Sequence, residues 1–156
     1  MSTFEHLLFL RVALSELEWP RRCAEGELEE VPTVLVVEDE DTLQAILHLA
    51  LKESGFDLMT VASGEDAIAI ILSGVVKYSA LVIDINLKGP MKGWEIARLV
   101  RQIDPAFPIV YMTGAAADAW ASEGVPGSIL LKKPFAPAQL VTAISQLLNT
   151  GSPTPD

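Results

Sequence analysis

The feature that most constrains the fold of this 156-residue chain is a fivefold alternation of short strand-like runs with longer segments of helical periodicity. The short runs are TVLVVE (33–38), DLMTVA (57–62), ALVID (80–84), PIVYMT (108–113) and SILLK (128–132). The segments with helical spacing are 41–54, 64–74, 93–103, 115–124 and 137–149. Strands that alternate with helices form a parallel sheet with helices on both faces. The sequence therefore predicts a three-layer α/β fold.

The segments outside this alternation have a different character. The spacing of the apolar residues in 3–18 predicts an extra helix with one apolar stripe, formed by Leu7, Leu10, Leu14 and Leu17. We therefore divide the chain into an N-terminal helix and connector (1–32), an α/β domain (33–149) and a disordered tail (150–156). Two roles stay open for the extra helix. It folds back on its own domain, or it joins a homodimer interface.

Charge and composition exclude several classes of function. A net charge of -10 argues against binding to nucleic acid or to an anionic membrane, because both attract clusters of Lys and Arg. No apolar run approaches the roughly 20 residues of a membrane-spanning helix. Cys23 is the only cysteine and has no partner for an internal disulfide, and the first 20 residues lack a basic leader with an uninterrupted apolar core. We expect a cytoplasmic protein whose partners are proteins.

Polar residues stand where the predicted strands end. They are Glu38 and Asp39 after the first strand, Asp84 after the third, Thr113 after the fourth, and Lys132 and Lys133 after the fifth. In a parallel sheet ordered 2-1-3-4-5 these ends are neighbours. Three close carboxylates repel one another, and Mg²⁺, which prefers oxygen ligands, resolves that repulsion. The chemistry that fits is phosphoryl transfer with Asp84 as the nucleophile.

Four motifs carry a resemblance to a known family. VVEDE, LVIDIN, VYMTG and KKPF occur in this order at the ends of the predicted strands. Together they resemble the receiver domain of bacterial two-component response regulators, over about residues 33–149. The resemblance implies a flavodoxin-like fold with sheet order 2-1-3-4-5.

The resemblance also implies a role for each site residue. Asp84 would accept a phosphoryl group from the phosphohistidine of a histidine kinase or histidine phosphotransfer protein. Asp39 and Asp84 would bind Mg²⁺ together with the backbone carbonyl of Asn86, and Glu38 would act beside the metal or through water. Thr113 and Lys133 would contact the phosphoryl group, and the peptide bond between Lys133 and Pro134 would be cis. The domain would not be an enzyme acting on other substrates.

Three features differ from the commonest pattern of the family. The loop after Asp84 is one residue longer, with Lys88 where a Pro is usual and Gly93 displaced by one. Leu130 stands where many members carry a Tyr or Phe that moves together with the Thr. No output domain follows the last helix in this sequence, which resembles the stand-alone receivers that act by docking to a downstream protein target.

Two other classes of function remain as alternatives. VLVVEDEDT resembles the nucleophile strand of haloacid dehalogenase-like phosphatases, in which Asp39 would attack and Asp41 would be the second acid. That family's pattern places Thr or Val where this chain has Leu43, and it needs a later acidic pair that the chain does not show. The third class is a receiver-like adaptor that is never phosphorylated, and the complete set of acid, Thr and Lys residues argues against it.

Overall fold

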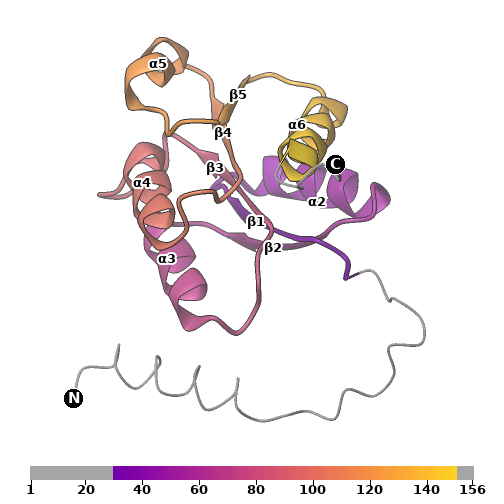
Figure 1. The fold of residues 1–156 in the computed structure, drawn as a ribbon. Coiled ribbons are helices and arrows are strands. Elements are labelled where there is room, and N and C mark those ends of the chain that lie inside the picture. Colours follow the sequence, from indigo (N-terminus) through magenta and orange to yellow (C-terminus); the bar gives the residue numbers. More distant parts are fainter. Residues whose placement is uncertain (1–29, 151–156) are drawn as a thin grey trace, which may run out of the picture.

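The computed structural model describes residues 30–150, which form one five-stranded parallel sheet between two layers of helices (Figure 1). The strands are β1 (Thr33–Val37), β2 (Asp57–Val61), β3 (Ala80–Asp84), β4 (Ile109–Thr113) and β5 (Ile129–Lys132). Their order is β2-β1-β3-β4-β5. This is the flavodoxin-like arrangement that the sequence predicts. The extra helix predicted over 3–18 and nearly all of the connector and tail lie outside the described residues.

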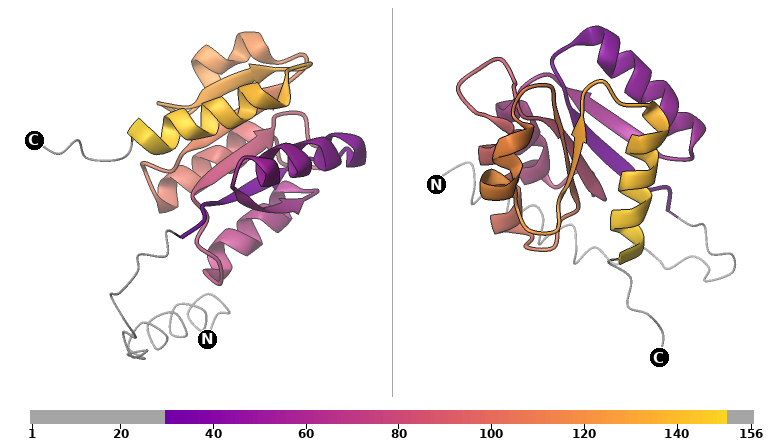
Figure 2. Two further views of the ribbon diagram at one scale, coloured as in Figure 1. Left: turned by 90° about the vertical axis from the view of Figure 1, so that its right-hand side faces the viewer. Right: turned by 90° about the horizontal axis from the view of Figure 1, so that it is seen from above.

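The helices are divided between the two faces of the sheet, as the two further views make clear (Figure 2). Helices α2 (Asp41–Glu53) and α6 (Pro137–Thr150) cover one face, while α3 (Gly64–Ser73), α4 (Gly93–Ile103) and a short α5 (Trp120–Glu123) cover the other. Among the described residues, none of these helices combines the length and the apolar character needed to cross a membrane.

Two apolar cores follow from the alternation of side chains along the strands. In β1, Leu35 and Val37 pack toward α3 and α4, whereas Val34 and Val36 pack toward α2 and α6. Successive strand residues point to opposite faces, so one strand supplies both cores. Strands β3 and β4 are buried along their whole length. The central strands are therefore packed against helices on both faces, and the polar residues at their ends are attached to rigid strands.

The connection between β4 and β5 is less helical than the Ala-rich sequence predicts. A 3₁₀ turn (Ala117–Ala119) leads into the single turn of α5, which ends at Gly124. Alanine favours helix but buries little surface, so contacts with the rest of the fold decide the outcome. The Trp120 indole donates a hydrogen bond to the Ser128 hydroxyl at 3.1 Å, and this contact draws the segment back onto the start of β5.

Candidate functional site

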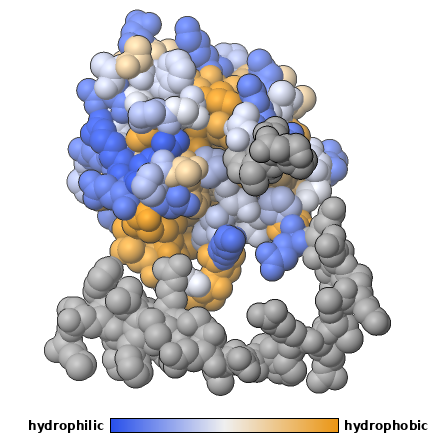
Figure 3. Space-filling view, viewed as in Figure 1, coloured by the Kyte–Doolittle hydropathy of each residue, from blue (hydrophilic) through white to orange (hydrophobic). Residues whose placement is uncertain are grey.

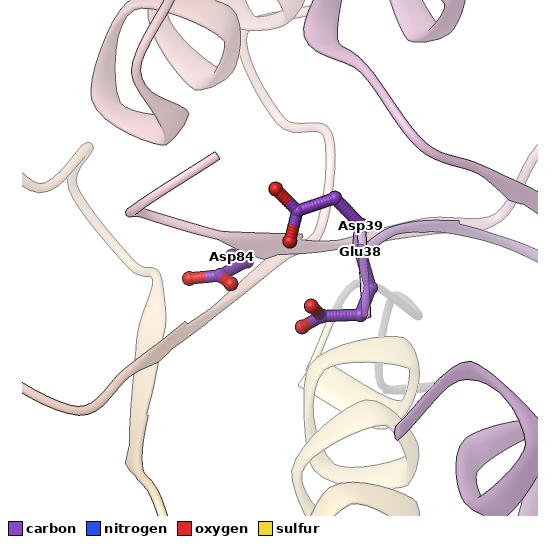
Figure 4. Close-up of side chains that lie close together, drawn as sticks. All are labelled: Glu38, Asp39 and Asp84. Atoms are coloured by element: carbon purple, nitrogen blue, oxygen red, sulfur yellow. The ribbon is translucent and has the colours of Figure 1, made fainter. Parts of the chain in front are cut away.

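Three carboxylates meet at the carboxyl ends of β1 and β3. Val37 pairs with Ile83 in the sheet, so the next residues, Glu38 and Asp84, also lie next to each other. Together with Asp39 they place one carboxylate oxygen each within 4.8 Å of one another, and the close-up shows all three groups turned to the same side (Figure 4). Glu38 is fully buried and Asp84 is only 5% exposed. The sequence prediction that these acids converge is confirmed in position.

Backbone amides of the surrounding loops hold each carboxylate in place. The amide of Glu40 donates to Glu38 Oε1 at 3.0 Å, that of Asn86 to Asp84 Oδ1 at 2.9 Å, and that of Lys88 to Asp39 Oδ2 at 2.9 Å. Hydrogen bonds from the backbone fix the direction of a carboxylate. The contact from Lys88 joins the loop after β3 to the end of β1 and has no signal in the sequence.

Lys133 supplies the positive charge of the cluster. Its ammonium donates to Glu38 Oε2 and to Asp84 Oδ2, both at 3.0 Å, from a side chain that is 24% exposed. The peptide bond to Pro134 is cis. Lys132 is exposed, because neighbouring strand residues point in opposite directions. Of the two adjacent lysines, Lys133 is therefore the one that reaches the acids.

Burial and charge shift two pKa values in this cluster. Burial, followed by the negative charge of Asp84, raises the pKa of Glu38 above its ordinary value, although the hydrogen bonds from Lys133 and the Glu40 amide act against the shift. For Lys133, burial acts to lower the pKa, but the hydrogen bonds and charges of Asp84 and Glu38 outweigh it, so the pKa is raised. Lys133 is thus a fixed cation, and the cluster carries an excess of negative charge.

Thr113 lies beside this cluster and is tied to β5. It is fully buried, and its carbonyl accepts a hydrogen bond from the Lys133 amide at 2.8 Å. Its hydroxyl oxygen accepts from the Ala116 amide at 2.9 Å, which leaves the hydroxyl proton available as a donor. In the described part of the chain, no hydrogen bond joins this hydroxyl to Asp84. The structure therefore brings four predicted side chains together and leaves Thr113 adjacent to them.

Leu130 is half-buried against the core on the α3–α4 face. Its partner in the sheet is Tyr111, a fully buried residue of β4. The Tyr111 hydroxyl accepts a hydrogen bond from the Val125 amide at 3.1 Å, and its ring lies 4.7 Å from that of Trp94, centroid to centroid. The buried aromatic residue of this region is thus Tyr111 on β4. Its contacts with Trp94 and Val125 were not predicted from the sequence.

Gly93, the first residue of α4, is a site residue whose function the sequence left unassigned. A Cβ built on it would lie 2.7 Å from the Asp84 carbonyl oxygen and 2.8 Å from Ile85 Cα. Its amide donates to the Ile85 carbonyl at 3.1 Å. Only glycine fits so close to another backbone, and the helix start is thereby packed directly against the strand end that bears Asp84.

The oxygen-rich cluster fits a hard divalent cation. Three carboxylates and one ammonium leave a formal charge of minus two, which one Mg²⁺ would balance, and carboxylate oxygens are its preferred ligands. The backbone amide of Lys88 donates to one oxygen of Asp39, while Lys133 and the loop amides donate to oxygens of Glu38 and Asp84. Carboxylate oxygens keep further lone pairs, and one oxygen of each acid lies within 4.8 Å of the others. Glu38, Asp39 and Asp84 are the residues that could hold such an ion.

Comparison with known proteins places this fold and this acidic site in one family. The model of the response regulator receiver domain matches residues 34–145. The chain belongs to the response regulator receiver domain family, whose members are the phosphate-accepting modules of two-component systems.

Individual relatives agree with the family match. A response regulator receiver protein from Sinorhizobium medicae is 48% identical, with a TM-score of 0.74, over 77% of this chain and 96% of that one. A response regulator from Chloroflexus aurantiacus, described as putative, is 31% identical with a TM-score of 0.68, over 77% and 99%. The transcriptional regulatory protein TcrA of Mycobacterium tuberculosis is 35% identical over 76% of this chain and 46% of its own length. The chain spans about half the length of the curated relatives that it matches first.

Proposed function

We propose that Asp84 accepts a phosphoryl group from the phosphohistidine of a histidine kinase or histidine phosphotransfer protein and that the protein signals through contacts with a downstream protein. The observation that carries the proposal is the ammonium of Lys133 held at 3.0 Å from both Glu38 and Asp84. Capping or turn formation accounts for one acid at a strand end, but not for a buried set with its own counter-charge.

The transfer is an in-line displacement at phosphorus. An oxygen of the Asp84 carboxylate forms the new P–O bond while the P–N bond to the histidine breaks, and the electron pair leaves with the imidazole nitrogen, which takes up a proton. The product is an acyl phosphate. Water later attacks phosphorus and breaks the P–O bond, which releases inorganic phosphate and restores the carboxylate.

Each site residue has a defined part in this proposal. Lys133 neutralises charge on the phosphoryl oxygens, and the Thr113 hydroxyl donates a hydrogen bond to one of them. Glu38, Asp39 and Asp84, with the Asn86 carbonyl, would hold Mg²⁺. When bound, this ion neutralises charge on the transferred group and orients it. The Asn86 amide donates a hydrogen bond to Asp84 Oδ1 and so fixes the direction of this carboxylate.

The phosphodonor must dock next to Asp84, because its phosphorus has to come within bond-forming distance of the carboxylate. An apolar groove of about 460 Å³ borders the site, between the start of α2 and the segment after β5. Leu43 and Ile46 line one side of it, and Pro134 and Phe135 line the other. An apolar surface that adjoins the reactive group suits a protein donor.

The test is to expose the full chain to a small phosphodonor with Mg²⁺ and to follow its intact mass. We expect the increment of one phosphoryl group on the wild type and none on Asp84→Asn, which keeps the shape of the side chain and loses the nucleophile. Chelation of Mg²⁺ should also abolish the increment. A base-labile label on Asp84→Asn at the wild-type level would overturn the assignment.

The same variants distinguish phosphorylation of Asp84 from the haloacid dehalogenase interpretation. Asp41, its second acid, is exposed at the first position of α2 and lies outside the acidic cluster. In that interpretation Asp39→Asn alone would abolish a phosphatase activity of many turnovers, while Asp84→Asn would retain it. A chain that takes up no phosphoryl group under any of these conditions would favour the adaptor interpretation instead.

A further inference from the structure

One end of the groove between α3 and α4 carries an exposed apolar surface, which we call the α3–α4 patch. It consists of Leu72, Val75, Val76, Leu99 and Ile103. These are five of the ten large apolar side chains that are exposed in the described part of the chain, and Val75 is 85% exposed. The space-filling view shows the apolar surface at the lower edge of the molecule, over α3 and the loop after it (Figure 3). So much exposed apolar surface in one place indicates a contact site.

The two helices contribute to this patch from facing sides. A Cβ at Gly64 of α3 would run into the Ile96 side chain of α4, so the Ile96 side of α4 faces α3. Leu99 and Ile103 follow Ile96 by three and seven residues and therefore share that side. The opposite side of α4 is already occupied, because Arg98 forms an ion pair with Glu123 of α5. On the α3 side, Ile96 is buried and Leu99 and Ile103 are exposed.

A hollow in the surface adjoins the patch. A cavity of about 280 Å³ is lined by apolar groups from α3, α4 and the loops that follow them, including Ile71, Val76, Tyr78, Ile103 and Phe107. A concave apolar surface of this kind accepts an apolar side chain such as leucine. Lys77 and Asp104, both exposed, also line it, so that its rim carries one positive and one negative charge.

The chain enters the sheet beside this cavity. The Ser79 amide donates to the Thr33 carbonyl at 2.8 Å, and Tyr78, the residue before Ser79, lines the cavity. The segment that precedes β1 thus begins within reach of the patch. Residues 19–32 could extend over about 45 Å if fully stretched, which is more than the length of a helix over residues 3–18, about 24 Å.

We propose that residues 3–18 dock on the α3–α4 patch of their own chain, with the leucine stripe (Leu7, Leu10, Leu14 and Leu17) against the apolar surface. A helix of this length is marginal in water unless its apolar face is buried, and the patch supplies an apolar surface next to the point where the chain enters. A second copy could also supply such a helix, but the tether gives the chain's own segment a high effective concentration.

Disulfide trapping in the full-length chain tests this proposal. Cys23→Ser removes the natural thiol, and Leu14→Cys is then combined with Val75→Cys. Under mild oxidation we expect an intramolecular disulfide, seen as a faster-migrating monomer on a non-reducing gel. The matched pair combines Leu14→Cys with Met59→Cys, because Met59 is an exposed apolar residue of β2 outside the patch. Docking should make the first pair close about tenfold faster or more, since it raises the local thiol concentration.

Two outcomes would overturn the proposal. Equal rates for the two pairs would mean that the segment is tethered without docking, and a disulfide-linked dimer whose yield falls on dilution would assign the patch to a second copy. A second measurement guards against a poorly folded variant. Val75→Asp and Leu14→Asp should each lower the melting temperature by about 3 °C, and the double variant by no more than either alone. Additive effects, or no effect at Val75, would contradict docking.

Discussion

The β1–β3 side of the site and the β4–β5 side are built differently. On the first side the two strands are buried almost throughout, and loop amides hold each carboxylate. On the second side β5 is only partly buried, α5 is a single turn, and within the described residues no hydrogen bond joins the Thr113 hydroxyl to Asp84. The comparison teaches that the carboxylates on the first side are held by loop amides and buried strands, whereas β5 and the segment before it have fewer such supports.

Lys133 joins the two sides through its ion pairs with Glu38 and Asp84, and removing it should have the largest effect. Lys133→Ala leaves Glu38 and Asp84 without their counter-charge, and breaking a buried pair costs about 3–5 kcal/mol. Because Lys133 is 24% exposed, we expect a lower loss of unfolding free energy, about 2–4 kcal/mol, in urea denaturation without divalent metal. Lys132→Ala is the control and should change it by less than about 0.5 kcal/mol. Equal losses would mean that the ion pairs do not hold the two sides together.

A pair of glycines compares the packing of the two sides directly. Gly93→Ala forces a Cβ against the backbone of Asp84 and Ile85, and such overpacking costs about 1–3 kcal/mol. Gly114, the residue after β4, has no atom within 4 Å of a Cβ, so Gly114→Ala should change stability by less than about 0.5 kcal/mol. Denaturant unfolding of both variants measures the difference. A similar cost at both positions would refute the contrast between the sides.

Tyr111 tests how much holds the β4–β5 side in place. Tyr111→Phe leaves the buried Val125 amide without its acceptor, which costs about 1–2 kcal/mol, while the apolar packing against Trp94 is kept. Hydrogen exchange should then speed up in residues 120–128 and stay unchanged in β1 and β3. Tyr78→Phe is the control, because its hydroxyl makes no hydrogen bond within the described residues, and it should alter neither readout. Faster exchange across the whole sheet would show that the two sides unfold as one.

The smallest expected effect is a pH dependence on the β1–β3 side. Burial, and after it the charge of Asp84, raises the pKa of Glu38 above its ordinary 4.5. The folded state therefore binds this proton more tightly than the unfolded state does. Its contribution to stability is fully present below pH 4.5 and is lost as the pH rises through the raised pKa. The stability of wild type minus that of Glu38→Gln should fall over this window without divalent metal, and a constant difference would contradict the assignment.

Most of the fold could be predicted from the sequence, because β-branched runs and helical periodicity alternate without interruption. The segments 80–84 and 93–103 match β3 and α4 residue for residue. The helix predicted over 115–124 is where the pattern and the structure differ most. Its alanines favour helix locally, but the segment is shaped by the hydrogen bonds of Trp120 with Ser128 and of Val125 with Tyr111, eight and fourteen positions apart, and such contacts leave no periodic signal.

The site, like the fold, has a part that the sequence predicts and a part that it does not. Strand-end positions and parallel topology were enough to bring Glu38, Asp39, Asp84 and Lys133 together, since all of them depend on strand order. The supports of the site could not be foreseen in this way. The Lys88 amide that holds Asp39 and the fit of Gly93 against Asp84 depend on the exact path of the loop after β3.

The ion pair between Lys133 and Glu38 joins residues that are 95 positions apart, and this separation matters while the chain is being made. Synthesis runs from the N-terminus, and the three acids have left the ribosome well before Lys133 follows. A nascent chain that ends after β3 therefore exposes its carboxylates without their counter-charge. Completion of the pocket requires the last strand, so a chain that stops early lacks the group that locks the acids in place. The complete site therefore forms only after the whole domain has been synthesised.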